Sequence, residues 1–336
     1  ELDKVVVIAY GAVKKSDLTG SVSTMDMKDI RDTPVSSVDH ALQGRIAGAD
    51  IMSTTGEPGA ATSIRIRGTR SISASNEPLI VVDGVLDAIS DLNDINPSDI
   101  ESISVLKDAS STAIYGSRGS NGVIVITTKS GSANSGRPSI TLRADAGFSH
   151  LPKGIDVMDA SEFAQFRNDY ALVSTSDNNA SITETTPLSE YPYPNPLSYG
   201  TGTDWIKEVT RVAPYQNYDV SVSGRTKNTS YFGSFGFNDN QGIIDKSGQS
   251  RMSARFNIHH SFTKWLKVGL NYNYSYRDQL RNQASLTGTS WWSAAVFLSP
   301  MIKTYSNFND LWYSGQKFNS PRTLIDMCKR ERIARS

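Results

Sequence analysis

The sequence predicts a small α+β domain followed by antiparallel strands of a transmembrane β-barrel, and three observations support this fold class. Residues 100–131 read as a strand, a short helix, a glycine-punctuated loop and a second strand. Stretches after residue 138 alternate apolar and polar residues over lengths that suit barrel strands. Before residue 138 the only aromatic residues are Tyr10 and Tyr115, whereas every Phe and Trp comes later. Two regions with different surroundings therefore meet at a linker, residues 132–137.

Composition excludes several classes of protein. The 336 residues carry 34 basic and 34 acidic side chains, so there is no electrostatic case for nucleic-acid binding. Cys328 is the only cysteine, which excludes an internal disulfide framework. No apolar run approaches the roughly 18–20 residues of a spanning helix, so the sequence excludes a helical membrane protein. Residue 1 is not followed by a signal peptide, and we expect a mature or an incomplete chain.

In the first region the pattern predicts short elements. We expect a strand over 2–9, a loop or helical turn over 23–30, a helix over 38–46, and strands over 50–53, 63–67 and 79–82. Asp83-Gly84 forms a tight turn, and Asn96-Pro97 forms a turn with Ser98 or Asp99 as a cap. Within 100–131 we expect strands over 100–106 and 123–128, joined by a helix that Asp108 or Ser110 caps and Gly116 ends.

In the second region the pattern predicts long strands. We expect strands over 140–148, 218–222, 231–237, 252–258 and 267–276, helices over 161–170 and 205–209, and a polar loop over 174–203. A soluble β-sandwich or solenoid also alternates, but long strands with tyrosine stripes favour a barrel. Residues 291–300 are predicted to belong either to the aromatic girdle of the barrel or to a loop. Residues 329–335 are predicted to form a solvated tail.

Four motifs carry a family resemblance. They are residues 2–8 (LDKVVVI), 64–68 (IRIRG), 78–85 (PLIVVDGV) and 104–124 (SVLKDASSTAIYGSRGSNGVI). In this order they resemble the plug-domain signature of TonB-dependent outer-membrane transporters, most closely the SusC/RagA branch. The signature residues are Arg65, Arg67, Gly68, Asp83, Gly84, Lys107, Asp108, Tyr115, Gly116, Arg118, Gly119 and Gly122.

The resemblance implies a division of the chain: a TonB box and linker over 1–20, a plug domain over 21–131, a linker over 132–137, and the N-terminal part of a barrel with extracellular loops over 138–336. It also implies that the plug sits inside the barrel. The TonB-binding residues would be Leu2, Asp3, Lys4, Val5, Val6, Val7 and Ile8. From the pattern alone these residues could equally be the first strand of the domain; the resemblance favours a docking strand that adds to a sheet edge of TonB.

The resemblance also implies partners and a place in the cell. We expect a multi-pass β-barrel in the lipid of the outer membrane, TonB with its inner-membrane energising complex, a SusD-like lipoprotein lid, and oligosaccharide or peptide substrates. Tyr191, Tyr193 and Trp205 are candidate substrate contacts in the predicted loops. We expect Arg65, Arg67, Lys107 and Arg118 to pair with carboxylates on the barrel wall, with ordinary surface charge as the alternative.

Catalytic and metal chemistry find no support in the sequence. The glycines at 116, 119 and 122 follow a helix and precede a strand, the reverse of a phosphate-binding loop. The four histidines lack metal-ligand spacing, and Asp91 and Asp94 read as a solvated loop. We therefore expect no enzyme activity, no catalytic residue, no metal and no cofactor.

The predicted barrel is incomplete in this sequence. A plugged transporter uses about 22 strands, and residues 138–336 supply far fewer. We therefore expect that this chain alone does not transport, and liposome swelling by the 336-residue product would refute that. A TonB-dependent signal-transducing receptor is an alternative that predicts a further N-terminal domain. A secreted carbohydrate-binding β-protein is another, which predicts that residues 138–280 fold in water.

Overall fold

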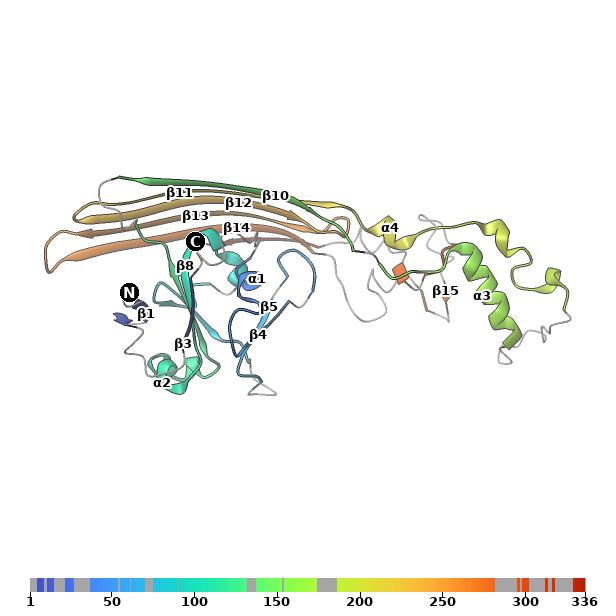
Figure 1. Cartoon of the computed structure of the whole chain (residues 1–336), viewed down its shortest axis with the longest axis horizontal. Coiled ribbons are helices and arrows are strands. Elements are labelled where there is room, and N and C mark those ends of the chain that lie inside the picture. The colour runs from blue at the N-terminus through green and yellow to red at the C-terminus, as the bar shows by residue number, and fades with distance from the viewer. Residues whose placement is uncertain are drawn as a thin grey trace.

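The structure is a computed structural model of the chain, and it describes most residues between 5 and 301 and a few beyond. The described residues are 5–8, 11–14, 22–26, 37–53, 55–60, 62–69, 75–89, 91–131, 137–152, 154–173, 186–281, 295–296, 298–301, 312–313, 316–317 and 329–335. Figure 1 shows a long, gently arched sheet, which we call the wall, lying over a small domain, the plug domain. Helix α3 lies on an arm beyond one end of the wall.

The plug domain is built on a five-stranded sheet with the order β3-β8-β9-β6-β7. Strands β6 and β9 are parallel, and the other neighbouring strands are antiparallel. Two separate hairpins pair β1 with β2 and β4 with β5. The strands are β1 (Val5–Ile8), β2 (Gly11–Lys14), β3 (Val22–Asp26), β4 (Ala49–Ser53), β5 (Thr62–Ile66), β6 (Leu79–Val82), β7 (Val85–Leu86), β8 (Ile100–Leu106) and β9 (Val123–Thr128). The helices are α1 (Val38–Leu42), η3 (Leu92–Asp94), η4 (Pro97–Asp99), α2 (Ala109–Thr112) and η5 (Ala113–Gly119).

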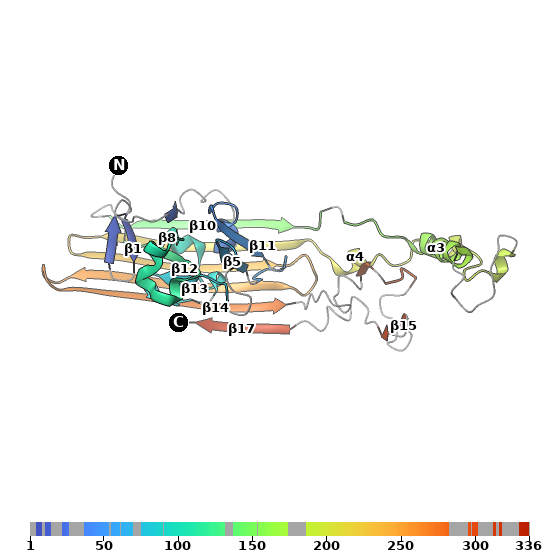
Figure 2. The ribbon, with the colours of Figure 1, turned by 90° about the horizontal axis from the view of Figure 1, so that it is seen from below.

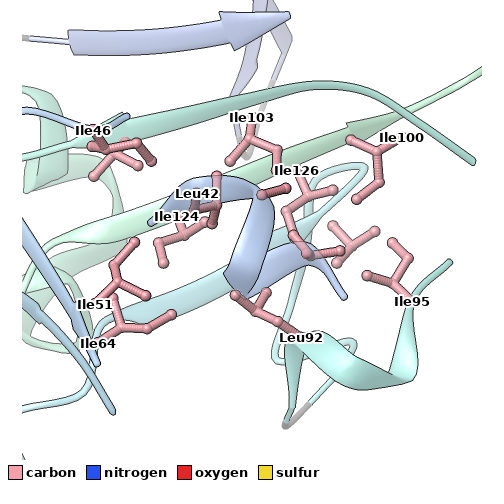
Figure 3. Packing of buried hydrophobic residues seen from close by; sticks show 14 of the residues in the cluster. Leu42, Ile46, Ile51, Ile64, Leu92, Ile95, Ile100, Ile103, Ile124 and Ile126 are labelled. Atoms are coloured by element: carbon pink, nitrogen blue, oxygen red, sulfur yellow. The ribbon is translucent and has the colours of Figure 1, made fainter. Parts of the chain in front are cut away.

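The plug has its own apolar core on both faces of this sheet. Figure 3 shows Ile103 and Ile126 from the sheet packed with Leu42 of α1 and with Leu92 and Ile95 beside η3. On the other face Leu79, Val81, Leu106, Tyr115, Val123 and Val125 form a second cluster. Because β9 is covered on both faces, its sequence is a continuous apolar run instead of an alternating one.

Several expected elements of the plug are confirmed. Strands β6, β8 and β9 have the predicted bounds. The Asp83-Gly84 turn joins β6 to β7 with positive φ at both residues, 49° and 84°, as a tight hairpin requires. Asp108 occupies the N-cap of α2, and Gly116 interrupts η5 with a φ of 61°.

Three expectations for the plug are wrong. Residues 23–30 were expected as a loop or helical turn, but residues 23–26 belong to β3, because its backbone pairs along the edge of β8. Helix α1 ends at Leu42, short of residue 46, and Gly44 with a φ of 71° follows it. The cap of η4 is Asn96, whose side-chain oxygen accepts from the N–H of Ser98 at 2.9 Å, in place of Ser98 or Asp99 themselves.

The wall is an antiparallel sheet with the order β10-β11-β12-β13-β14-β17. Its strands are β10 (Ser139–Ser149), β11 (Ala213–Arg225), β12 (Thr229–Gln241), β13 (Gly248–Ser261), β14 (Lys267–Arg281) and β17 (Lys329–Arg335). Figure 2 shows β17 lying along β14, so the expectation of a solvated tail over 329–335 is wrong. In the described part of the chain these strands form an open sheet, not a closed barrel.

The two faces of the wall differ in chemistry, as the alternation predicts. The face away from the plug exposes Ile140, Leu142, Phe148, Tyr218, Val220, Val222, Phe235, Phe237, Met252, Phe256, Val268, Leu270 and Tyr272. The face toward the plug buries Asp219, Arg251, Ser253, Arg255, Asn257, Ser275, Arg277 and Gln279. An apolar outer face and a polar inner face are what lipid on one side and a polar lumen on the other require.

Short and long connections alternate along the wall. Residues 226–228 join β11 to β12, and residues 262–266 join β13 to β14, at one end. At the other end, residues 150–212 carry α3 (Ala160–Val173), η6 (Leu188–Glu190), η7 (Pro196–Tyr199) and α4 (Trp205–Val209). The short strands β15 (Trp312–Tyr313) and β16 (Gln316–Lys317) pair with each other. Among the described residues, none of the helices is both long and apolar enough to cross a membrane.

Candidate functional site

The plug meets the wall through three arginines that project from β13 and β14. Arg251 and Arg255 lie on the same face of β13, and Arg277 lies directly opposite Arg251 on β14. All three are at most 5% exposed. Like charges directly opposite each other on a sheet destabilise it, so these buried guanidiniums need partners from outside the wall.

Arg255 finds its partners in the plug. Its Nη1 lies 3.4 Å from Oδ2 of Asp83, and its Nε lies 3.7 Å from Oδ2 of Asp99. Nη1 also donates to Oγ1 of Thr128 at 3.1 Å. Asp83 is itself fixed by the backbone N–H and the hydroxyl of Thr128, at 2.8 and 2.6 Å. The β6–β7 turn and the end of β9 therefore present a preorganised acidic site to the wall.

Arg277 and Arg251 hold the segment that leads into β8. Nη1 of Arg277 lies 3.0 Å from Oδ2 of Asp91, and its Nη2 lies 3.6 Å from Oδ1 of Asp94. Nη1 of Arg251 donates to the backbone carbonyls of Asn93 and Ile95, at 2.9 and 3.2 Å. The short helix η3 thus offers both carboxylates and carbonyl oxygens to two adjacent guanidiniums.

Asp219 on β11 supplies one carboxylate from the wall. It accepts from Nδ2 of Asn96 at 2.6 Å and from Oγ of Ser98 at 2.8 Å. These groups approach across β12 at Gly236, where an added Cβ would collide with the Asn96 amide and lie 2.8 Å from Oδ1 of Asp219. A residue without a side chain is therefore needed at position 236.

Burial at this interface shifts the pKa of one carboxyl. Removal from water raises the pKa of Asp99 above its ordinary value, because a charged carboxylate is costly to bury. The nearby Ser234 hydroxyl and the charges of Arg255 and Lys129 lower the pKa but do not cancel the effect of burial.

The expectation that plug cations meet wall carboxylates is wrong for the residues named. Arg67 pairs with Asp108 and Arg118 with Asp87, both within the plug. Arg65 donates to Thr69, and Lys107 donates to Ser23 at 2.7 Å and to the carbonyl of Ala47. At the described interface the polarity is reversed, with most of the anions on the plug and the cations on the wall.

The expectation that Asp91 and Asp94 lie in a solvated loop is also wrong. Asp94 is 2% exposed, and both residues pair with Arg277. The signal that could have located this site is the presence of Arg251, Arg255 and Arg277 on the polar side of alternating strands. Long basic side chains on the lumen face of a barrel require nearby anions.

A polar cavity of about 350 Å³ lies at the edge of the same interface. Ser37, Asp39, Ser53, Asn93 and residues 56–60 of the plug line one side, and the ends of β10, β12 and β13 line the other. It therefore lies at the end of the wall from which residues 150–212 extend. Gly59 brings the plug against the wall there, with a φ of 72° and no room for a Cβ beside the Gln249 amide.

The remaining predicted residues are distributed over the molecule. Leu2, Asp3 and Lys4 lie outside the described residues, and residues 5–8 form β1 with β2 as its neighbour. The signature glycines at 68, 84, 116 and 122 have positive φ, a backbone conformation that favours glycine. Their positions are therefore explained by turn geometry. An added Cβ at Gly119 would lie 2.9 Å from the carbonyl oxygen of Thr112, and Tyr115 is buried in the second plug core.

The three candidate substrate contacts lie on the extended loop and its base. Tyr193 stacks edge-to-face on Tyr199, with ring centroids 5.8 Å apart, and Tyr191 is half-buried. Trp205 is 2% exposed, packs with Val209, Ile244 and Ala295, and donates from Nε1 to the carbonyl of Ser299 at 3.1 Å. In this structure the Trp205 ring is therefore not presented to a ligand.

Comparison with known proteins identifies the plug domain. A family model described as the TonB-dependent Receptor Plug Domain matches residues 14–123. TonB-dependent receptor P26 of Formosa agariphila is 40% identical over 310 residues, which cover 92% of this chain and 30% of that protein. TonB-dependent receptor SusC of Bacteroides thetaiotaomicron is 36% identical over 331 residues, with 95% and 30% covered. The chain thus spans about 30% of the length of these relatives.

Solved structures agree with this result. The RagAB peptide importer in its open-open state superimposes with a TM-score of 0.77 at 28% identity, covering 98% of this chain and 40% of that chain. The unliganded ferric citrate transporter FecA superimposes with a TM-score of 0.50 at 12% identity, covering 77% of this chain and 31% of that chain. At 12% identity, the similarity to FecA is one of fold alone.

Proposed function

Because the chain belongs to the SusC/RagA family of TonB-dependent transporters, we propose that it forms the plug and the first barrel strands of an importer in the outer membrane. Its substrates are nutrients such as oligosaccharides or peptides. The apolar outer face of the wall contacts lipid, and the polar inner face encloses the plug.

The observation that carries this proposal is the contrast between the plug core and the plug–wall interface. The plug buries its apolar residues within itself, whereas the side chains that join it to the wall are charged or polar. Separating apolar surfaces costs about 25 cal/mol per Å². Separated ions and amides regain water, so a polar interface can hold a plug tightly and still release it at lower cost.

TonB, driven by its inner-membrane energising complex, supplies the pull. Residues 2–8 bind TonB by strand addition, in which several backbone hydrogen bonds bear the load together. Strand β1 fits this role, since in the described part of the chain it belongs to a two-stranded sheet separate from the main sheet of the plug. A SusD-like lipoprotein covers the extracellular side, where α3 lies beyond the wall (Figure 1).

The test uses the complete gene product in cells that depend on it for uptake. Val6→Pro removes a backbone N–H from β1, and Val6→Thr keeps both the N–H and the preference for extended structure. Uptake of a mixture of oligosaccharides and peptides is expected to be lost with Val6→Pro and kept with Val6→Thr, at equal levels of receptor in the outer-membrane fraction. Equal uptake by both variants would contradict strand addition by TonB at this segment.

A further inference from the structure

We propose that the turn end of the wall is a docking surface for anionic phospholipid, with Trp265 seated among the headgroups of one leaflet and Lys227 and Lys264 paired with their phosphates. The turn end consists of residues 226–228, between β11 and β12, and residues 262–266, between β13 and β14. Figure 1 shows both turns at the end of the wall opposite the arm that carries α3. The inference rests on the proposed place of the wall in the outer membrane and names the lipid chemistry that its turns select.

The apolar outer face of the wall continues into the second of these turns. The backbone N–H of Phe262 donates to the carbonyl of Leu266 at 3.0 Å, so strand pairing extends one residue beyond β13 and β14. Phe262 also packs edge-to-face on His260, with ring centroids 4.4 Å apart. Since side chains two residues apart share a face of a strand, Phe262 and Leu266 lie on the face that exposes Val268 and Leu270. The lipid-facing surface therefore reaches the tip of this hairpin.

This turn presents an indole that the protein leaves uncovered. Trp265 is 82% exposed and Phe262 is 61% exposed. The turn itself is held in place, because the N–H of Leu266 donates to Oγ1 of Thr263 at 2.9 Å. An indole has an apolar body and a polar N–H, and it is enriched where lipid meets water. The neighbouring turn, residues 226–228, reads TKN and has no apolar side chain, so the two turns supply an aromatic anchor and a polar rim.

The turn halves of these two hairpins are basic. Residues 220–235 and 254–275 contain neither Asp nor Glu. Apart from Arg255, which pairs with the plug, their Lys and Arg side chains are exposed, and none forms an ion pair within the described part of the chain; they are Arg225, Lys227, Lys264 and Lys267. Cations left free on a surface attract anions, and the nearest large apolar surface here is the one that lipid covers.

The opposite end of the outer face has the opposite charge. Asp239 lies two residues beyond Phe237 on β12, and Asp278 lies two residues beyond Tyr276 on β14, so both carboxylates lie on the outer face. An anionic headgroup is repelled at this border and attracted at the turn end. Short turns of bacterial outer-membrane barrels face the periplasm, so the charge pattern selects the periplasmic leaflet.

The combination of features favours a lipid surface over a soluble partner. The exposed indole is continuous with the lipid-facing wall, so a leaflet that covers Val268 and Leu270 also reaches Trp265. The ammonium groups of Lys227 and Lys264 stand at the tips of the two turns, at the level where headgroups lie. Each lysine near an anionic lipid surface strengthens the association about 5-fold.

Fluorescence of Trp265 in vesicles tests the inference locally. The complete gene product is inserted into phosphatidylcholine vesicles in which one tenth of the lipid is brominated phosphatidylglycerol or, in the comparison, brominated phosphatidylcholine. The Trp265 signal is the difference in emission between the native protein and Trp265→Phe. We expect brominated phosphatidylglycerol to quench this signal more strongly, with the lipid enriched about 5-fold for each lysine beside the ring.

Charge variants locate the preference. Lys227→Gln with Lys264→Gln is expected to make the two brominated lipids equally effective. Lys207→Gln with Lys246→Gln is the matched control, because it removes the same charge from two exposed positions at the arm end and should leave the preference unchanged. Equal melting temperatures of both double variants and the native protein show that they fold.

Three results would overturn the inference: equal quenching of the native protein by both lipids, a preference that survives in Lys227→Gln with Lys264→Gln, or a Trp265 signal that acrylamide in the water quenches and brominated lipid does not. The last result would mean that the turn faces water and is open to a protein partner. The assay needs neither TonB nor substrate. A protein that fails to insert into vesicles would contradict the proposed function, whereas insertion with Trp265 in water would contradict this inference alone.

Discussion

Nη1 of Arg255 in the wall lies 3.4 Å from Oδ2 of Asp83 in the plug, although 172 residues separate them in the chain. Nε of the same guanidinium lies 3.7 Å from Oδ2 of Asp99. One wall side chain thus joins the β6–β7 turn to the residue that precedes β8, two parts of the plug that the sequence keeps apart. We therefore expect the seating of the plug to depend on this arginine more than on either carboxylate.

Arg255→Met is expected to loosen the plug more than Asp83→Asn. Removing the arginine leaves the buried Asp99 and the partly buried Asp83 without their cation, at a cost of about 3–5 kcal/mol. Asp83→Asn leaves Arg255 paired with Asp99 and is expected to cost about 1–3 kcal/mol. Thermal unfolding of the complete gene product in detergent measures both, and a larger loss for Asp83→Asn would contradict the ranking.

Gly59→Ala is expected to displace the plug from the wall. An added methyl group would meet the Gln249 side chain, and the φ of 72° disfavours any residue with a Cβ. Gly56→Ala is the control, because its added Cβ meets no atom within 4 Å and its φ is not positive. We expect the melting temperature to fall by several degrees for Gly59→Ala but not for Gly56→Ala. Equal melting temperatures of the two variants would show that the plug does not pack tightly against the wall at Gly59.

The raised pKa of Asp99 predicts a pH dependence with a definite sign. A carboxyl whose folded pKa exceeds its unfolded value binds more protons when folded. It therefore destabilises the folded plug at neutral pH, and this loss is relieved as the pH falls through the folded pKa toward the unfolded one.

Asp99→Asn removes that titration. The variant is expected to melt at or above the temperature of the native protein at pH 7, with the difference shrinking as the pH is lowered. Melting curves of the native protein and Asp99→Asn across this pH range provide the measurement. A difference that grows toward acid pH would mean that ion pairing outweighs burial at Asp99.

The two faces of β11 make opposite predictions for neighbouring residues. Val220 lies on the exposed apolar face of the wall, and Ser221 points to the other side. Val220→Arg places a charge in lipid, at a cost of about 2–4 kcal/mol near the bilayer midplane. We expect it to lower the amount of assembled receptor in the outer-membrane fraction, with Ser221→Arg much closer to native; equal assembly of both variants argues against lipid contact on this face.

Much of the fold follows from local signals. Strand β8 alternates over most of its length, β9 is a buried apolar run, and the Asp83-Gly84 pair favours a tight turn, so the sequence predicts these elements closely. Strand β3 was not predictable in this way. Its residues VSTMD have no strong period, and only pairing with the edge of β8 makes them a strand.

The plug–wall site is harder to predict because it depends on contacts between distant residues. The pattern places Arg251 and Arg255 on a polar strand face but cannot say which anions reach them. Asp91 and Asp94 look like a solvated loop, since nothing local reveals that Arg277 covers them. The plug signature therefore identifies the domain, while the partners of its charges require the three-dimensional arrangement.

The central claim is that the wall arginines keep the plug in place, and the conductance of the complete gene product in a planar lipid bilayer tests it most directly. The native protein is expected to remain closed, and the triple variant Arg251→Met, Arg255→Met, Arg277→Met is expected to show frequent open events through a plug that no longer seats. A triple variant that stays as closed as the native protein, and melts at the same temperature, would contradict the account.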